Sequence, residues 1–299
     1  MQLLDAFRLY PSLFISTLLI AGLLVGSFLN VVIYRYPIML FREWSQMAKE
    51  ILTEQGFKVS GEAKDPNIKN EKFNIVFPRS RCSSCGHLIR SWENIPLISY
   101  LFQRGKCTQC SAHISLRYPF VELLTGLVFG YIAWRFGVSW QSLLYITLSS
   151  LLIVQIFIDI DHKILPDPIN YIILWLGLSA AAFGLTIPLM DAFIGALVGY
   201  LSLWAFYWTF KILTKKEGMG YGDFKLLAAL GAFVGYQKLL LVVIMSAGVG
   251  AIIGVSMILL KRSNRETQIP FGPYLAIAGW ITLFWGDNIL RQYFHSMGI

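Results

Sequence analysis

Charged residues are scarce in this sequence. Asp, Glu, Lys and Arg together make up 14% of the 299 residues, whereas soluble domains carry about 25%. Hydrophobic residues account for 56% of the chain, and its mean hydropathy is +0.60. A composition so poor in charge excludes an ordinary soluble domain and predicts a polytopic membrane protein.

A cleavable signal peptide is also missing. The N-terminus lacks the combination of a basic first segment, a short apolar run and a small-residue cleavage site. Instead, the apolar run from Leu13 to Ile33 is long enough to cross a bilayer, so we predict a first transmembrane helix that is retained.

Acidic residues are fewer than basic ones, 17 against 25, which gives a net charge of +8. In a soluble protein such an excess often indicates nucleic-acid binding. In a membrane protein it is typical of basic cytoplasmic loops. We therefore expect the lipid bilayer to surround the chain and expect no nucleic-acid partner.

Apolar runs of spanning length predict an all-α membrane protein with about eight transmembrane helices. With the N-terminus outside, 21 of the 25 Lys and Arg residues fall on the inner side, so both termini are predicted outside and residues 37–117 in the cytoplasm. The runs lie at 12–34, 118–136, 140–160, 168–187, 190–212, 224–236, 238–260 and 271–290.

Cysteine is rare, and its placement is informative. The four cysteines lie within 29 residues, as Cys82-Ser-Ser-Cys85 and Cys107-Thr-Gln-Cys110. Two such knuckles supply four thiolates, about 2.3 Å from a zinc ion, and disulfides are rare in the cytoplasm. A filled four-thiolate site has no open position, so we predict structural zinc, with redox or iron–sulfur use as the alternative. Two nearby histidines are interpreted as surface residues: His87 and His113.

The segment 37–117 is the only part large enough to form a soluble domain, which we expect to be small and zinc-ribbon-like. Apolar residues between Phe41 and Gly56 have helical spacing opposite a charged face. This predicts an amphipathic helix that lies on the membrane surface or packs on the cysteine module. Residues 58–72 are polar and predict a linker. The predicted division is a first transmembrane helix at 1–36, the cytoplasmic domain at 37–117 and a membrane core at 118–299.

Acids beside the apolar runs are few, and a charge there is costly unless it is paired or used. Asp159, Asp161 and Asp167 cluster where the third run ends, and Asp223 stands at the start of the sixth. The predicted topology brings both places to the cytoplasmic boundary. Two carboxylates that meet in apolar surroundings share a proton, which is the chemistry of aspartic peptide hydrolysis. A proton- or metal-coupled transporter uses paired acids equally well.

Two glycines precede Asp223, in Gly220-Tyr221-Gly222-Asp223. They permit backbone conformations closed to other residues and let a substrate chain approach closely. Three other acids have plainer interpretations, as a structural pair or helix cap for Glu122 and as solvated helix ends for Asp191 and Asp287.

A series of motifs covers nearly the whole chain, and together they are specific. The motifs are Gly26-Ser-Phe-Leu-Asn-Val-Val-Ile-Tyr-Arg35, Phe77-Pro-Arg-Ser-Arg-Cys82, the two knuckles, Glu93-Asn-Ile-Pro96, Arg104-Gly-Lys-Cys107, Ser115-Leu-Arg-Tyr-Pro119, Asp159 to Asp167, Gly220 to Asp223, and Pro270-Phe-Gly-Pro273. On these motifs, the chain resembles the bacterial type IV prepilin peptidases, which belong to the Gly-x-Gly-Asp class of membrane aspartic proteases.

The resemblance implies a bifunctional enzyme of the bacterial inner membrane. Such an enzyme cuts the basic leader from prepilins and type II secretion pseudopilins at the cytoplasmic face, just after a glycine. It then N-methylates the new N-terminal residue with S-adenosylmethionine. The implied catalytic acids are Asp159 and Asp223, with Gly220 and Gly222 as the supporting peptidase motif. Asp161 and Asp167 are the alternative or assisting acids, and the cysteine module belongs to the bifunctional branch.

The implied substrate fits the predicted topology. A prepilin has a basic leader followed by an apolar helix, which would lie among the spans and leave the scissile bond at the interface. Asp161, Asp167 and Glu217 either attract the lysines of the leader or are ordinary solvated loop acids. Pro270-Phe-Gly-Pro273 either shapes the substrate groove or forms a plain turn before the last helix.

The site of the methyl donor has no clear signature, because the sequence lacks a glycine-rich loop of the Rossmann kind. We expect the donor in the cytoplasmic module, with Glu93 and Gly105 as candidate cofactor-binding residues. A turn before the second knuckle explains Gly105 equally well.

Three hypotheses therefore follow from the sequence. The first is a membrane aspartic endopeptidase with methyltransferase activity. The second is a zinc-ribbon-bearing transporter that uses Asp159 and Asp223 as a proton relay. The third is a catalytically silent assembly factor that binds pilins.

Overall fold

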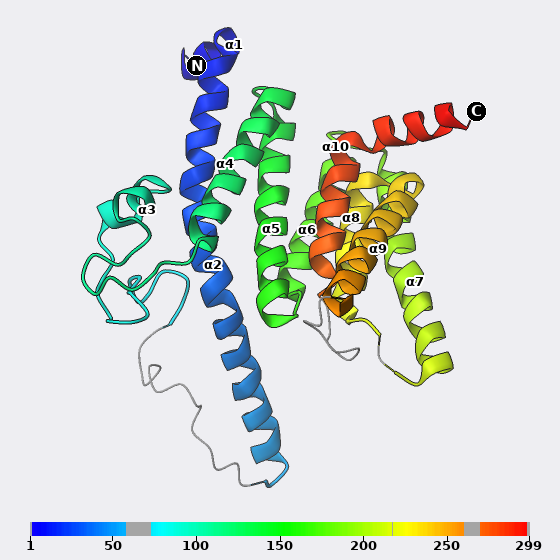
Figure 1. Cartoon of the computed structure of the whole chain (residues 1–299). Helices are drawn as coiled ribbons and strands as arrows, with labels where there is room; N and C mark the ends of the chain where they lie inside the picture. The colour runs from blue at the N-terminus through cyan, green and yellow to red at the C-terminus, as the bar shows by residue number, and fades with distance from the viewer. Residues whose placement is uncertain (1, 58–72, 217, 260–269, 298–299) are drawn as a thin grey trace. The chain divides into compact units, whose positions relative to one another are not determined.

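The computed structural model describes residues 2–57, 73–216, 218–259 and 270–297, and its regular elements in these ranges are helices (Figure 1). The predicted linker at 58–72, Glu217 and the basic residues Lys261, Arg262 and Arg265 lie outside the described residues. The helices are α1 (Gln2–Leu9), α2 (Pro11–Glu54), η2 (Ser91–Asn94), α3 (Ile98–Phe102), α4 (Arg117–Phe136), α5 (Trp140–His162), α6 (Asp167–Ala182), α7 (Leu189–Thr214), α8 (Tyr221–Val234), α9 (Tyr236–Leu259) and α10 (Gly272–Ser296).

The predicted all-helical class is confirmed for the described residues. Each predicted apolar run falls on a helix, from α2 and α4 to α10. Within the described residues, four helices are long and apolar enough to cross a membrane, namely α2, α5, α7 and residues Tyr236–Met257 of α9. The molecule is therefore a helical membrane protein.

The chain folds as two compact units, Met1–Gly137 and Val138–Ile299. The sequence predicted boundaries at 36 and 117 and assigned the second span to the membrane core. In the structure, the helix of that span, α4, packs along α2 in the first unit. The functional division into three parts stays a prediction.

Small residues allow α2 and α4 of the first unit to pack closely. A Cβ atom on Gly26 would lie 2.7 Å from the Cα of Glu122, so only glycine fits at this contact. Near the same level, the Asn30 side-chain amide donates a hydrogen bond to the Tyr118 carbonyl over 3.0 Å. Glu122 accepts a hydrogen bond from the Leu97 backbone N–H at the start of α3 (2.9 Å), which agrees with the structural role predicted for it.

α2 continues well beyond its apolar run, through Pro37 to Glu54. The sequence predicted a helix at 41–56 that lies on the membrane surface or packs on the cysteine module; residues up to Glu54 are helical, but they continue α2 and do not form a helix of their own. The end of an apolar run marks where a helix leaves the bilayer and not where it ends. Arg35 then ties the helix to the cysteine module, because its guanidinium donates to the carbonyls of Asn74 (3.1 Å), Ile75 (3.1 Å) and Pro78 (2.6 Å).

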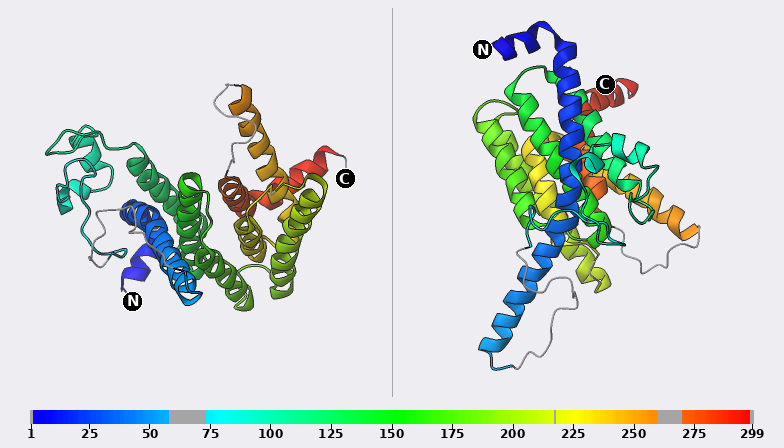
Figure 2. Two further views of the ribbon diagram at one scale, coloured as in Figure 1. Left: turned by 90° about the horizontal axis from the view of Figure 1, so that it is seen from below. Right: turned by 90° about the vertical axis from the view of Figure 1, so that its left-hand side faces the viewer.

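In the second unit, α8 lies among α6, α7, α9 and α10 (Figures 1 and 2). The whole stretch from Leu226 to Val234 is buried. Gly195 of α7 and Gly231 of α8 face each other's backbone and leave no room for a Cβ atom. α8 ends at Gly235, whose φ of +76° favours glycine. A short apolar helix can be the core of this unit because its neighbours cover every side.

Candidate active site and metal centre

Asp159 and Asp223 belong to the same unit of the protein, and both are buried. Asp159 lies in the last turn of α5, and Asp223 lies in the first turn of α8. The two residues are only 5% and 7% exposed. The two acids that the sequence singled out are therefore buried at the ends of two helices of one unit.

The start of α10 holds Asp159. The backbone N–H of Gly272 donates a hydrogen bond to Asp159 Oδ2 over 3.1 Å. A Cβ atom on Gly272 would lie only 2.6 Å from the same oxygen. Gly272 comes from the motif Pro270-Phe-Gly-Pro273, for which the sequence offered a groove or a turn and no contact with an aspartate. The motif was visible in the sequence, but its contact with Asp159 could be found only from the fold.

Gly220 and Gly222 shape the approach to Asp223. Gly220 precedes α8 in an extended conformation, and its carbonyl accepts the Asp223 backbone N–H over 3.2 Å. A Cβ atom on Gly222 would lie 2.8 Å from the Cβ of Leu165. The Gly-x-Gly-Asp segment therefore packs against the chain that follows α5.

Leu165 is a residue of this site that the sequence analysis missed. Its side chain lies against Gly222, and its two δ-methyl groups would each be 2.9 Å from a Cβ atom on Gly272. It therefore packs between the segments that carry or hold the two aspartates. A leucine between Asp161 and Asp167 has no chemical signature in the sequence, so only the fold reveals this contact.

Asp161 and Asp167, the predicted alternative or assisting acids, have other surroundings. Asp161 is exposed. Asp167, at the start of α6, accepts a hydrogen bond from Lys225 Nζ over 2.5 Å. Lys225 lies on α8, two residues beyond Asp223. This ion pair connects the start of α6 to the first turns of α8. It gives Asp167 a structural contact close to the site.

A second contact that the sequence did not indicate lies one turn before Asp159. The fully buried Gln155 donates a hydrogen bond from Nε2 to Asn170 Oδ1 over 2.8 Å. Because buried amides are costly unless they are paired, this bond fixes α5 against α6 just beyond the aspartates.

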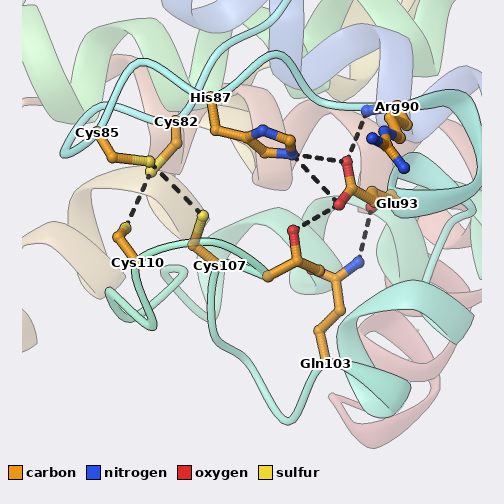
Figure 3. Close-up of polar contacts among 9 residues, drawn as sticks. Cys82, Cys85, His87, Arg90, Glu93, Gln103, Cys107 and Cys110 are labelled. Atoms are coloured by element: carbon orange, nitrogen blue, oxygen red, sulfur yellow. Dashed lines mark hydrogen bonds and ion pairs between the residues drawn. The ribbon is translucent and has the colours of Figure 1, made fainter.

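The four cysteines of the first unit meet in one cluster (Figure 3). Their sulfur atoms all lie within 4.8 Å of one another, with Cys82 Sγ 3.8 Å from Cys110 Sγ and Cys85 Sγ 4.0 Å from Cys107 Sγ. A tetrahedron of sulfurs with 2.3 Å metal–sulfur bonds has edges of about 3.8 Å. The cluster therefore fits a tetrahedral metal ion such as zinc.

Glu93 links the two knuckles of this cluster (Figure 3). Its carboxylate accepts hydrogen bonds from Thr108 Oγ1 of the second knuckle (2.5 Å) and from the Arg90 backbone N–H (2.7 Å). His87 Nε2, just after the first knuckle, lies 3.2 Å from Glu93 Oε2. The Thr108 bond, and then the Arg90 bond, lower the pKa of Glu93 below its usual value. His87 thus lies beside the cysteines, paired with Glu93, and His113 is exposed.

Gly105 has a structural role in the turn before the second knuckle. Its φ is +66°, and a Cβ atom would lie 2.7 Å from the Tyr100 hydroxyl oxygen. Its N–H donates to the Tyr100 carbonyl over 2.9 Å, and its carbonyl accepts the Ile114 N–H over 2.8 Å. The backbone of Gly105 and the carboxylate of Glu93 already form hydrogen bonds within the module. Their predicted cofactor roles stay predictions.

Comparison with known proteins matches the two units separately and the chain as a whole. Residues 20–136 match the model of the bacterial peptidase A24 N-terminal domain, and residues 146–255 match that of the type IV leader peptidase family. A protein of Pseudomonas aeruginosa named prepilin leader peptidase/N-methyltransferase is 51% identical over 298 residues, which cover 100% of this chain and 99% of the relative.

Two further relatives carry the same name. The protein of Stutzerimonas stutzeri is 53% identical, over 95% of this chain and 94% of its own length. The protein of Neisseria gonorrhoeae is 43% identical, over 91% of each chain. No solved structure matches the chain. Full-length similarity at this level, joined to a buried aspartate directly behind a Gly-x-Gly motif and a second buried aspartate in the same unit, means that the chain belongs to the type IV leader peptidase family.

Proposed function

We propose that this chain cleaves the leader peptide of type IV prepilins and type II secretion pseudopilins with Asp159 and Asp223, and then N-methylates the new N-terminus. Both activities are named in relatives that match the full chain, and the transporter hypothesis receives no support. The observation that carries the catalytic assignment is that two buried carboxylates lie on segments of the second unit that meet at Leu165, through Gly222 beside Asp223 and through Gly272 beside Asp159.

Hydrolysis follows from a shared proton. Two carboxylates at short range do not both ionise, so one acts as a base and the other as an acid. The ionised carboxylate takes a proton from a water molecule, which attacks the carbonyl carbon of the scissile bond. The protonated carboxyl donates its proton to the carbonyl oxygen. As the C–N bond breaks, the leaving amine receives the proton taken from the water, and a hydroxyl proton of the intermediate returns to the second carboxylate as the C=O bond re-forms.

The surroundings of the two carboxyl groups support their roles as acid and base. The Gly272 N–H fixes the orientation of Asp159. Asp223 Oδ1 is buried and has no hydrogen-bond partner among the residues that the structure describes, which leaves it available to water or substrate. The glycines at 220 and 222 keep side chains away from the approach to this carboxyl group.

We further propose that the eight predicted runs all cross the bacterial inner membrane, with both termini outside and cleavage at the cytoplasmic face. The apolar helix of the substrate would then lie in the bilayer beside the second unit, with its basic leader in the cytoplasm. The excess of Lys and Arg in the predicted inner segments supports this orientation.

Zinc and S-adenosylmethionine are the two cofactors that we propose. Cys82, Cys85, Cys107 and Cys110 would hold the zinc ion, whose role would be to stabilise the small cytoplasmic module. S-adenosylmethionine would supply an electrophilic methyl group to the new terminal amine. The engaged carboxylate of Glu93 does not fit a direct contact with this donor in the observed arrangement, so we derive no step of the transfer through it.

Cleavage of a purified prepilin in detergent tests the catalytic assignment. Asp159→Asn and Asp223→Asn should each abolish cleavage, because either change removes a member of the proton-sharing pair. Asp191→Asn, at the start of α7, is the matched control and should cleave normally. Normal processing by either of the first two variants would refute the assignment. Mass spectrometry of the mature N-terminus measures methylation in the same reactions.

A further inference from the structure

The cysteine module carries a group of large apolar side chains that its own fold leaves exposed. We call this group the α3 surface and define it by residues of η2, α3 and the turn between them: Trp92, Ile95, Ile98, Leu101 and Phe102. Leu101 is 73% exposed and Phe102 is 85% exposed. Exposed apolar side chains gathered on so small a module indicate a contact surface.

The depth of this surface relative to α2 follows from two contacts. Leu97, directly before α3, donates its N–H to Glu122 of α4. The Cα of Glu122 in turn lies against Gly26 of α2. Gly26 is seven residues inside the apolar run, which ends at Ile33, or about 10 Å at 1.5 Å per residue. The start of α3 is therefore held level with the apolar run of α2.

The views of the first unit agree with this depth. In Figures 1 and 2, α3 lies at the level of the N-terminal, apolar half of α2 and not beyond its end. Amphipathic segments at a membrane interface bury their apolar side chains about 5–10 Å into the boundary between headgroups and acyl chains. The position of α3 matches that range.

The charges around the α3 surface complement an anionic membrane. Arg90, Arg104 and Lys106 flank it and are exposed. The one acid between Arg90 and Lys106 is Glu93, and its carboxylate is engaged by Thr108 and the Arg90 N–H. Basic side chains beside exposed Trp and Phe are typical of segments that bind anionic lipid headgroups.

We propose that the α3 surface inserts into the lipid interface of the bilayer crossed by α2. This insertion would hold the cysteine module at the membrane surface, beside the point where α2 leaves the bilayer. The inference concerns the placement of the module and does not depend on either enzymatic activity. A lipid surface is favoured over a protein partner because the contacts of Leu97 and Glu122 already hold the start of α3 level with the apolar run of α2.

Photo-crosslinking in liposomes tests the proposal. The full-length protein carries p-benzoylphenylalanine at Phe102 and is reconstituted into vesicles of phosphatidylethanolamine and phosphatidylglycerol. Irradiation should give lipid adducts, detected by mass spectrometry of the intact protein. The matched control places the same probe at Gln109, an exposed residue of the second knuckle outside the α3 surface, and should give at least tenfold less adduct. Crosslinks from Phe102 to another part of the chain or to added prepilin, without lipid adducts, would overturn the proposal.

A second measurement separates insertion from misfolding. The probe is placed at Ile98 in a chain that also carries Leu101→Asp and Phe102→Asp. If apolar insertion holds the module at the interface, the lipid adduct at Ile98 should fall several-fold. The metal content of this variant should remain equal to that of the parent protein, which shows that the module is intact. An unchanged adduct yield in a metal-loaded variant would contradict the inference.

Discussion

The orientation of the Asp159 carboxyl group depends on the backbone N–H of a glycine, Gly272. The Gly272 N–H reaches Asp159 Oδ2 only because Gly272 lacks a Cβ atom, which would lie 2.6 Å from that oxygen. The motif at the start of α10 is thus part of the proposed catalytic site. It holds the carboxyl group from the side of α10, while α5 supplies the residue itself.

Gly272→Ala tests this contact. The added methyl group should displace the Asp159 carboxyl group or the start of α10, and misplacement by about 1 Å can cost on the order of 100-fold in rate. We expect cleavage to fall by about this factor while the helical content, measured by circular dichroism, is unchanged. Gly248→Ala is the control, because a Cβ atom there has no neighbour within 4 Å. Equal activity of the two variants would show that the Gly272 contact is not needed.

Glu93 offers a second prediction for a single residue, at the metal centre. In Glu93→Gln, one of the two side-chain oxygens becomes an amide nitrogen, which cannot accept the bonds from Thr108 or the Arg90 N–H. Changes to such supporting contacts typically cost 10–100-fold in metal affinity. We expect about tenfold faster release of zinc to a chelator. Glu54→Gln, at the end of α2, should release zinc at the parental rate.

The pKa of Glu93 sets the pH range of this contribution. Its pKa in the folded protein is lowered, chiefly by the Thr108 hydrogen bond, so the ionised form is stabilised by folding. The contribution is therefore fully present above the unfolded pKa of about 4.3. It is lost as the pH falls through the lower, folded value. Zinc release by Glu93→Gln at neutral pH consequently reports the full effect of the contact.

At the scale of helices, the first unit depends on the close approach of α2 and α4. Gly22 and Gly26 of α2 face Gly126 and Glu122 of α4 at distances that exclude a Cβ atom. Such small-residue contacts let helices associate in a bilayer, where lipid tails remove the usual hydrophobic driving force. This contact also fixes Glu122, and through it the start of α3.

Gly26→Ala should therefore destabilise the first unit. Forcing a methyl group into a closely packed contact costs about 1–3 kcal/mol, and we expect a lower thermal unfolding temperature in detergent. Gly130→Ala on α4 is the matched control, because its Cβ atom would meet the Leu19 side chain at an ordinary 3.6 Å. Equal unfolding temperatures for both variants would contradict the close contact at Gly26.

The helices themselves were predictable because apolar runs are a strong, local signal. Continuity of α2 through Pro37 was not, since an apolar run reports where a helix meets the bilayer and a proline inside a helix usually kinks or ends it. The bonds from Arg35 to three loop carbonyls, the Gln155–Asn170 pair and the packing of Leu165 were equally hidden. Each joins residues far enough apart in sequence that only the fold brings them together.

At the scale of the whole molecule, the four-cysteine cluster and the two buried aspartates fall in different compact units. The sequence proposed both groups of residues, because cysteine spacing and rare acids beside apolar runs carry chemical information. It did not indicate that α4 packs on α2, because an apolar run does not reveal which helix it packs against. The family models divide the chain at nearly the same place, between residues 136 and 146.

This division predicts that the two activities can be separated. Cys82→Ser together with Cys85→Ser removes two of the four thiolates, so the first unit should lose its metal ion and the fold of its module. The second unit contains both aspartates and all the contacts described around them, so prepilin cleavage should continue. If the module carries the methyl donor, the product should be cleaved but unmethylated, as measured by mass spectrometry of the pilin N-terminus. Ser83→Ala, between the same two cysteines, should leave metal content and both activities intact. Loss of cleavage together with methylation, in a double variant whose second unit remains folded, would show that the peptidase site requires the metal module.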